Sequence, residues 1–154
     1  MQPFIKLYLR FAKIAAALQS PFLLFVRLYW GWQFIVTGWG HMHGMAGFIQ
    51  FFTKLGIPLP AFNAYFVAGL EFVGGMLLIL GLGTRIISLL LAGDMIVAFL
   101  TADRDALATA FTSDPTNFYA AAPYTFLFAS IILLIFGAGY FSIDKYIVRH
   151  LKRT

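Results

Sequence analysis

The sequence of 154 residues contains no cysteine and few charged residues. Without cysteine, the chain cannot by itself form disulfides, exchange thiols or hold an iron–sulfur cluster. Charged residues make up only 11% of it, against roughly 25% in soluble domains, so a soluble enzyme is nearly excluded. The chain is also 61% hydrophobic and 18% aromatic. This composition excludes disorder and indicates an integral membrane protein.

Four apolar segments have the length expected of membrane-spanning helices, about 20 residues each. They cover residues 21–40, 62–82, 86–102 and 120–141. None of them shows the polar–apolar alternation of a membrane β-barrel. The sequence therefore predicts an all-α protein in which residues 21–144 form one domain, an integral membrane four-helix bundle.

The first 20 residues differ from these spans. Their apolar side chains recur at steps of three and four, and Lys6, Arg10 and Lys13 follow the same step on another face. This pattern predicts an amphipathic interfacial helix over residues 1–20, lying on an anionic membrane surface. No signal-peptide cleavage site follows it. At the other end, residues 145–154 form a basic tail.

Basic residues outside the spans are distributed unevenly. The loops on one side hold Lys54 and Arg104, whereas the termini and the turn between the second and third spans hold Lys6, Arg10, Lys13, Arg85, Lys145, Arg149, Lys152 and Arg153. The positive-inside rule therefore predicts that both termini face the cytoplasm. Because these residues flank apolar spans and form no separate basic domain, the lipid bilayer is the expected partner and nucleic acid is not.

Three ionisable side chains fall inside the predicted spans, where each costs roughly 2.5–3.5 kcal/mol on insertion scales. Arg27, Glu71 and Asp94 have similar predicted depths, and each shares a helix face with small residues. We therefore expect an intramembrane polar cluster in which Arg27 pairs with one carboxylate while Glu71 carries a proton. Such an acid can donate to a carbonyl or relay a proton. The alternative is a structural cluster that fixes helix register.

The segment after the first span contains His41, Met42, His43 and Met45, which are copper-type ligands. Because side chains two residues apart on a helix point about 200° apart, both imidazoles would reach one metal only from an unwound segment, and no metal site is predicted. The apolar side chains that follow at helical spacing are expected to rest in the outer interface: Phe48, Phe51, Phe52 and Leu55.

Four passages of the chain resemble a known family. They are Arg27 with Gly31, Phe34, Thr37 and Gly38; the segment 51–60, ending in Gly56-Ile57-Pro58-Leu59-Pro60; the segment 70–85, with Glu71 and Gly81-Leu82-Gly83-Thr84-Arg85, followed by 95–98; and the segment 137–144, ending in Ser142-Ile143-Asp144. In these passages the chain resembles the DoxX family of small four-helix membrane proteins. His41 stands where the family often has Lys, and Ala138 replaces a usual Pro.

The resemblance implies a bundle in the cytoplasmic membrane, with links to quinone-coupled sulfur oxidation and to membrane complexes that handle thiol and oxidative stress. The first hypothesis is therefore a quinone- or quinol-interacting subunit that has no cofactor of its own and works with a redox-enzyme partner. A second copy of the chain is another candidate partner. The candidate quinone-site residues are His41, Glu71, Arg27 and Trp39. The alternatives are a non-catalytic anchor, assembly factor or scaffold, and a small transporter; whether the chain is itself an enzyme stays open.

Overall fold

The computed structural model describes residues 2–112 and 114–151, and every regular element in these ranges is a helix. In chain order the helices are α1 (Gln2–His43), α2 (Met45–Lys54), α3 (Pro60–Leu80), α4 (Thr84–Thr101), α5 (Arg104–Ala108), α6 (Thr116–Ala120), α7 (Ala122–Phe136) and α8 (Ile143–Leu151). The prediction of an all-α chain is confirmed. Lys152 and Arg153 of the predicted basic tail lie outside the described residues.

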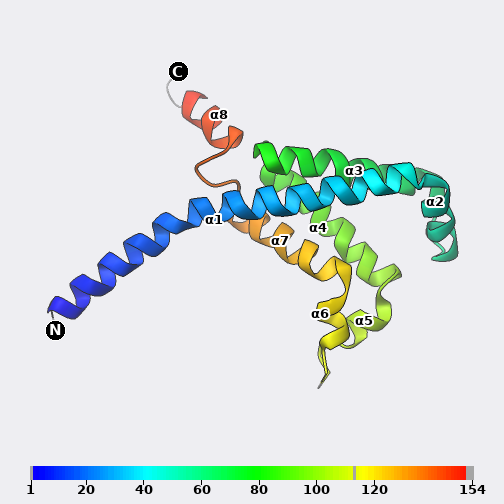
Figure 1. Ribbon diagram of the computed structural model, residues 1–154, viewed down its shortest axis with the longest axis horizontal. Helices are drawn as coiled ribbons and strands as arrows, with labels where there is room; N and C mark the ends of the chain where they lie inside the picture. Colours follow the sequence, from blue (N-terminus) through cyan, green and yellow to red (C-terminus); the bar gives the residue numbers. More distant parts are fainter. Residues whose placement is uncertain (1, 113, 152–154) are drawn as a thin grey trace.

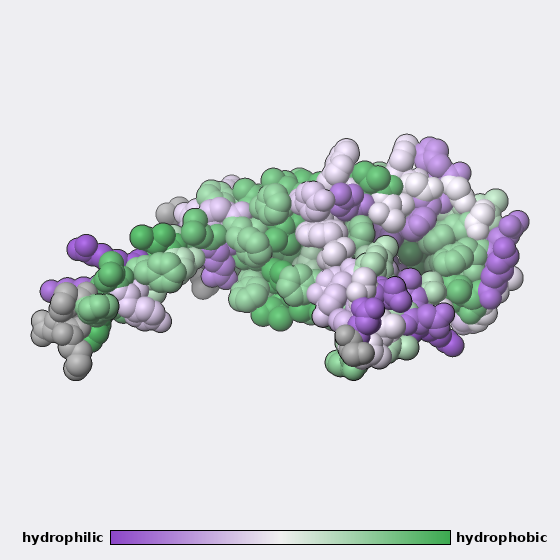
Figure 2. Space-filling model, turned by 60° about the horizontal axis from the view of Figure 1, so that its bottom comes forward, coloured by the Kyte–Doolittle hydropathy of each residue, from purple (hydrophilic) through white to green (hydrophobic). Residues whose placement is uncertain are grey.

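Four apolar helices form an elongated bundle, with α1 packed along α3 and α4 packed along α7 (Figure 1). By length and composition, α1, α3 and α4 can each cross a membrane. The buried core between the helices includes Phe34, Leu78, Leu91 and Leu133. Apolar side chains cover the middle of the bundle, as Figure 2 shows for one face. These features are those of the predicted membrane bundle.

The two ends of the bundle differ. We call the end that carries α2, α5 and α6 the loop end, and the end that carries the α3–α4 turn and α8 the terminal end (Figure 1). Hydrophilic side chains gather over the loop end, where the surface is also hollowed (Figure 2).

Helix α7 is shorter than the span of residues 120–141 that the sequence predicts. It has 15 residues and ends at Phe136, which gives a length of about 22 Å. Gly137 stops it with φ 75° and ψ −163°, a backbone conformation that other residues rarely adopt. Residues 137–142 then form a loop at the terminal end, and this loop brings backbone carbonyls close to α1.

Helix α1 continues without a break through Pro21, from Gln2 to His43. The predicted interfacial helix over residues 1–20 is therefore not a separate element but the first half of α1, which projects away from the bundle in Figure 1. A proline inside a helix removes one backbone hydrogen bond. Strong helix formers on both sides, such as Ala17, Leu18 and Leu23, let the helix continue despite this loss.

Glycines allow α1 and α3 to approach closely. A Cβ atom on Gly75 would lie 2.5 Å from the carbonyl oxygen of Gly31, and one on Gly38 would lie 2.5 Å from the backbone nitrogen of Phe72. Small residues at such contacts are typical of membrane helix pairs. The α1 face predicted to point into the bundle is thus the one that packs on α3, and Gly38 is adjacent to Glu71.

Candidate functional site

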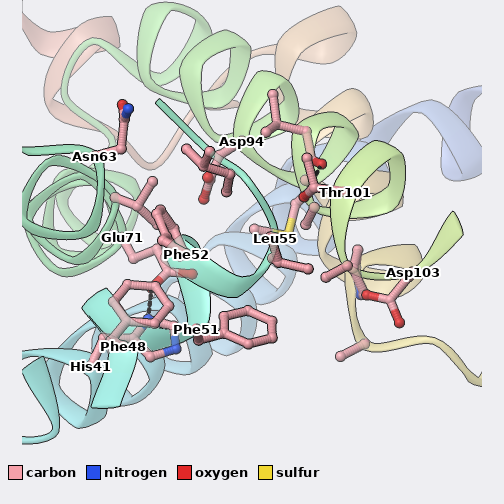
Figure 3. Close-up of a pocket in the computed structure, with 18 of the residues that line it drawn as sticks. His41, Phe48, Phe51, Phe52, Leu55, Asn63, Glu71, Asp94, Thr101 and Asp103 are labelled. Atoms are coloured by element: carbon pink, nitrogen blue, oxygen red, sulfur yellow. Dashed lines mark hydrogen bonds and ion pairs between the residues drawn. The ribbon is translucent and has the colours of Figure 1, made fainter. Parts of the chain in front are cut away.

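A cavity of about 500 Å³ lies at the loop end. The long helices α1, α3, α4 and α7 contribute to its wall, and α2 closes one side of it. Most of the wall is apolar, including the rings of Phe48, Phe51, Phe52 and Phe126. Its ionisable groups are His41, Glu71, Asp94 and Asp103. Figure 3 shows these polar side chains arranged around the same space as the aromatic rings of α2.

The central polar feature of the cavity is a hydrogen bond between α1 and α3, which becomes an ion pair when the histidine is protonated. Nδ1 of His41 lies 2.7 Å from Oε2 of Glu71, and the glutamate side chain is only 4% exposed (Figure 3). The imidazole also stacks on the ring of Phe48, with the ring centroids 3.9 Å apart and the planes 9° from parallel. Because Glu71 holds Nδ1 and Phe48 holds the ring plane, the histidine is fixed in one orientation with Nε2 left for a ligand.

Asp94 of α4 lines the same cavity. It is close enough to Glu71 and His41 for their charges to interact. Its Oδ2 atom is buried and has no hydrogen-bond partner among the described residues. A buried polar atom of this kind is costly unless a proton, a water molecule or a ligand satisfies it. The expectation that Glu71 and Asp94 meet inside the bundle agrees with this geometry.

Arg27 does not belong to this site, and the predicted pairing with a carboxylate of the cluster is wrong. Its guanidinium donates instead to four backbone carbonyls at the terminal end, those of Leu78, Ile79, Ala138 and Phe141, at 2.7–2.8 Å. Leu78 lies seven residues after Glu71, about 10 Å along α3. The sequence could not show that the end of α3 and the 137–142 loop would offer backbone carbonyls to the guanidinium.

Trp39 also lies outside the cavity. Its side chain is 54% exposed and contacts His43 and Phe72. Two residues along a helix correspond to a turn of about 200°, so Trp39 and His41 cannot both face the bundle interior. The same geometry separates the two histidines: Nδ1 of His43 lies 3.0 Å from the carbonyl oxygen of Trp39, away from the Glu71 pair.

The structure reassigns the apolar side chains of α2. Phe48, Phe51, Phe52 and Leu55 were expected to rest in the outer membrane interface, but all four line the cavity. Gly44 separates α1 from α2 and lets the chain fold back over the bundle. The helical spacing of these residues was visible in the sequence, yet nothing in it showed that they would line a cavity or that Phe48 would stack on His41.

The terminal end is fastened by residues from three distant parts of the chain. Gly81 and Gly83 adopt left-handed conformations, with φ values of 67° and 60°, and form a tight turn between α3 and α4. Asp144 accepts hydrogen bonds from the backbone nitrogens of Gly83 and Thr84, at 2.7 and 3.0 Å. Together with Arg27, these contacts tie α1, the α3–α4 turn and the segment after α7 to one another. The arrangement is structural and lies apart from the cavity.

Comparison with known proteins agrees with these features. The DoxX family model matches residues 22–104. The chain belongs to the DoxX family. It is 35% identical over 129 residues to "Putative oxidoreductase CatD" of Bacillus subtilis (strain 168), covering 84% of this chain and 89% of that protein. It is 32% identical over 113 residues to "Inner membrane protein YqjF" of Escherichia coli (strain K12), covering 73% of this chain and 81% of that protein. No solved structure matches it.

The family passages occupy two separate places in this DoxX protein. Arg27, the Gly81–Gly83 turn and Asp144 meet at the terminal end, where they hold the bundle together. Glu71 and the segment before Pro58 meet at the loop end, where they shape the cavity. His41, at the position where the family often has Lys, supplies the partner of Glu71.

Proposed function

We propose that this DoxX protein binds a quinone or quinol in the loop-end cavity and serves as a membrane subunit of an oxidoreductase system. The observation that carries the proposal is the ion pair of His41 and Glu71 in the wall of a mostly apolar cavity of about 500 Å³. Small-molecule sites have volumes of roughly 300–1,000 Å³ and combine apolar walls with a few placed polar groups. An apolar ring with polar oxygens fits that description.

The residues of the cavity have distinct roles in this proposal. Phe48, Phe51 and Phe52 of α2 provide flat apolar surfaces for the ring and exclude water from the ion pair. Nε2 of His41 is the hydrogen-bonding atom for a ligand oxygen, because Nδ1 already faces Glu71. The His41–Glu71 pair can hold or release a proton at that position.

Oxidation of a quinol releases two electrons together with two protons. The cavity offers groups that accept protons, but the sequence contains no cysteine to take part in electron transfer. The proposed electron acceptor is therefore a redox partner protein. The name of the B. subtilis relative, "Putative oxidoreductase CatD", supports a link to redox chemistry.

The proposed location is the cytoplasmic membrane, with both termini in the cytoplasm. The name of the E. coli relative, "Inner membrane protein YqjF", places that protein in the inner membrane. At the terminal end, Arg85 lies in the first turn of α4, and Lys145 and Arg149 lie in α8. Lys54 and Arg104 lie in α2 and α5 of the loop end. By the positive-inside rule the terminal end then faces the cytoplasm.

Quinone binding can be measured on the full chain in lipid nanodiscs, by titration with a short-chain quinone analogue. We expect Glu71→Gln to weaken binding by about tenfold or more, since one hydrogen-bonded buried charge contributes about 1.5–3 kcal/mol. Arg85→Gln, an exposed change at the opposite end, is the matched control and should leave the affinity unchanged. Thermal unfolding of both variants checks that they are folded.

The result against the proposal is the absence of saturable binding by the folded wild-type protein. If cells that carry Glu71→Gln also behaved like the wild type, and the variant still copurified with its partner protein, a scaffold role would replace the proposed quinone-binding role.

A further inference from the structure

We infer that the cavity exchanges protons with one face of the membrane only, the face at the loop end, and that Asp94 is the carboxyl through which they pass. What these protons serve, their exchange with a bound quinone or quinol, rests on the proposed function. The one-sided access does not depend on it, because it follows from how the two ends of the bundle are built.

A continuous wall of α4 connects Asp94 to the loop end. Asp94, Ala98 and Thr101 follow at steps of four and three, so they lie on one face of the helix, and Asp103 comes directly after it. All four line the cavity. Asp94 and Thr101 are about 10 Å apart along the helix. Figure 3 shows Asp94, Thr101 and Asp103 in succession along this wall, with Glu71 on the opposite side of the cavity.

Asp94 is the residue of the site whose carboxyl group has an oxygen without a hydrogen-bond partner among the described residues. Glu71 is engaged with His41 at 2.7 Å, whereas Oδ2 of Asp94 is buried without a partner among the described residues. The other ionisable groups that line the cavity are His41 from α1, Glu71 from α3 and Asp103 after α4; α2 and α7 contribute no ionisable group to its described lining. A second carboxyl beside an ion pair can take up a proton from water and pass it on.

The terminal end has a second cavity, of about 380 Å³, but it shares no lining residue with the loop-end cavity. Between the cavity and Arg27 lies a layer of side chains that are completely buried and apolar: Phe34, Leu78, Leu91 and Leu133. Beyond this layer the Arg27 guanidinium occupies the space between α3 and the 137–142 loop, held by four carbonyls. A dry apolar layer excludes water, and a fixed positive charge repels protons.

Three buried hydroxyl groups are candidates for a competing route. Those of Thr84 and Ser88 lie on the terminal side of Leu91 in α4, whereas Ser130 precedes Leu133 in α7 and lies toward the loop end. The side-chain oxygens of Thr84, Ser88 and Ser130 are buried and have no hydrogen-bond partner among the described residues. Leu91 lies three residues from both Ser88 and Asp94, and its side chain is completely buried between them. The polar groups of α4 are therefore interrupted at Leu91, and none of the three hydroxyls belongs to the lining of the cavity.

The absence of native cysteine allows a direct test by single-cysteine labelling of the full chain in the membrane. Asp94→Cys and Ser88→Cys would be exposed to a charged, membrane-impermeant methanethiosulfonate, once in spheroplasts and once in inverted vesicles. Asn117→Cys in α6 and Lys145→Cys in α8 are both at exposed positions and report which face is the loop end and which the terminal end. The test thus needs no prior assumption about orientation.

Asp94→Cys should react from the same face as Asn117→Cys, at least about tenfold faster than from the other face, because only a thiol that meets water ionises and reacts. Ser88→Cys should react from neither face. If Asp94→Cys fails to fold, Ala98→Cys on the same wall replaces it. Reaction of Asp94→Cys from the Lys145 face, no reaction of either wall variant from the Asn117 face, or reaction of Ser88→Cys from the Lys145 face would each overturn the inference.

A second measurement tests Asp94 as the proton-carrying group. Asp94→Asn keeps the shape of the side chain but cannot take up a proton. It should change the pH dependence of quinone-analogue binding, to which the His41–Glu71 pair still contributes, while leaving one-sided labelling of Ala98→Cys unchanged. A binding profile with wild-type pH dependence would refute the role of Asp94. If no analogue binds to the wild type, the proposed function fails, and the labelling result still decides the question of access.

Discussion

Replacement of Arg27 with Leu tests the conclusion that this arginine holds the bundle together. Its side chain is 1% exposed, and it donates to four carbonyl oxygens. Leu78 O keeps a second donor, the backbone nitrogen of Gly81, so the carbonyls of Ile79, Ala138 and Phe141 are the ones that lose their donor. An unsatisfied buried group costs about 1–3 kcal/mol. Three of them give a loss of stability of about 5 kcal/mol.

For a chain of this size, about 5 kcal/mol corresponds to a fall in Tm of about 10–20 °C. The melting of purified protein in detergent, followed by tryptophan fluorescence, measures it. Arg85→Leu is the matched control: Arg85 is exposed and donates one hydrogen bond to Ile135 O at 3.1 Å, so its Tm should change by no more than about 4 °C. Equal melting of the Arg27→Leu variant and the wild type would refute the structural role. If Arg27→Lys lost quinone binding while its Tm stayed unchanged, Arg27 would have to be counted among the ligand-binding residues.

Three further predictions concern packing, the cavity wall and the terminal end. Gly75→Ala should lower the free energy of unfolding by about 2 kcal/mol or more in the same melting assay, because the new Cβ meets the α1 backbone. The control is Gly93→Ala, which has open space around it and should leave the free energy of unfolding unchanged. Phe52→Ala should weaken quinone-analogue binding about tenfold by opening the cavity to water, and unchanged affinity would contradict the closing role of α2. A hydrogen bond from Arg149 and the charge of its guanidinium lower the pKa of Tyr140. Arg149→Gln should therefore raise the pKa of Tyr140, as measured by tyrosinate absorbance during an alkaline titration. A titration curve identical to that of the wild type would contradict the Arg149–Tyr140 contact.

The prediction of the fold from the sequence succeeded where length and periodicity carry the information. Apolar runs located the four bundle helices, and small residues at steps of three and four identified the faces that pack. The ends of helices were less certain. α7 stops five residues early because Gly137 adopts a special backbone conformation, and α1 passes through Pro21 without ending. Both outcomes depend on a balance of local backbone energies that composition does not reveal.

The candidate site was predicted in part. Glu71 and Asp94 do face one cavity, because an ionisable side chain in a span must point into the bundle. The partner of Glu71 was assigned incorrectly, since the sequence offers both Arg27 and His41 on the same face of α1, about 21 Å apart along the helix. The choice between them depends on where free carbonyls lie. Arg27 donates to carbonyls at the end of α3 and in the 137–142 loop, while α2 places Phe48 against His41.

The sequence by itself determined that this chain is a helical membrane protein, how many helices its bundle has and which faces of them carry the buried charges, because burial in lipid is governed by the character of each residue. The tertiary structure decided which charged groups meet. A buried ion pair forms only when two helices and a covering segment bring its atoms within hydrogen-bond distance. Such distances depend on loops and backbone turns far away in the chain.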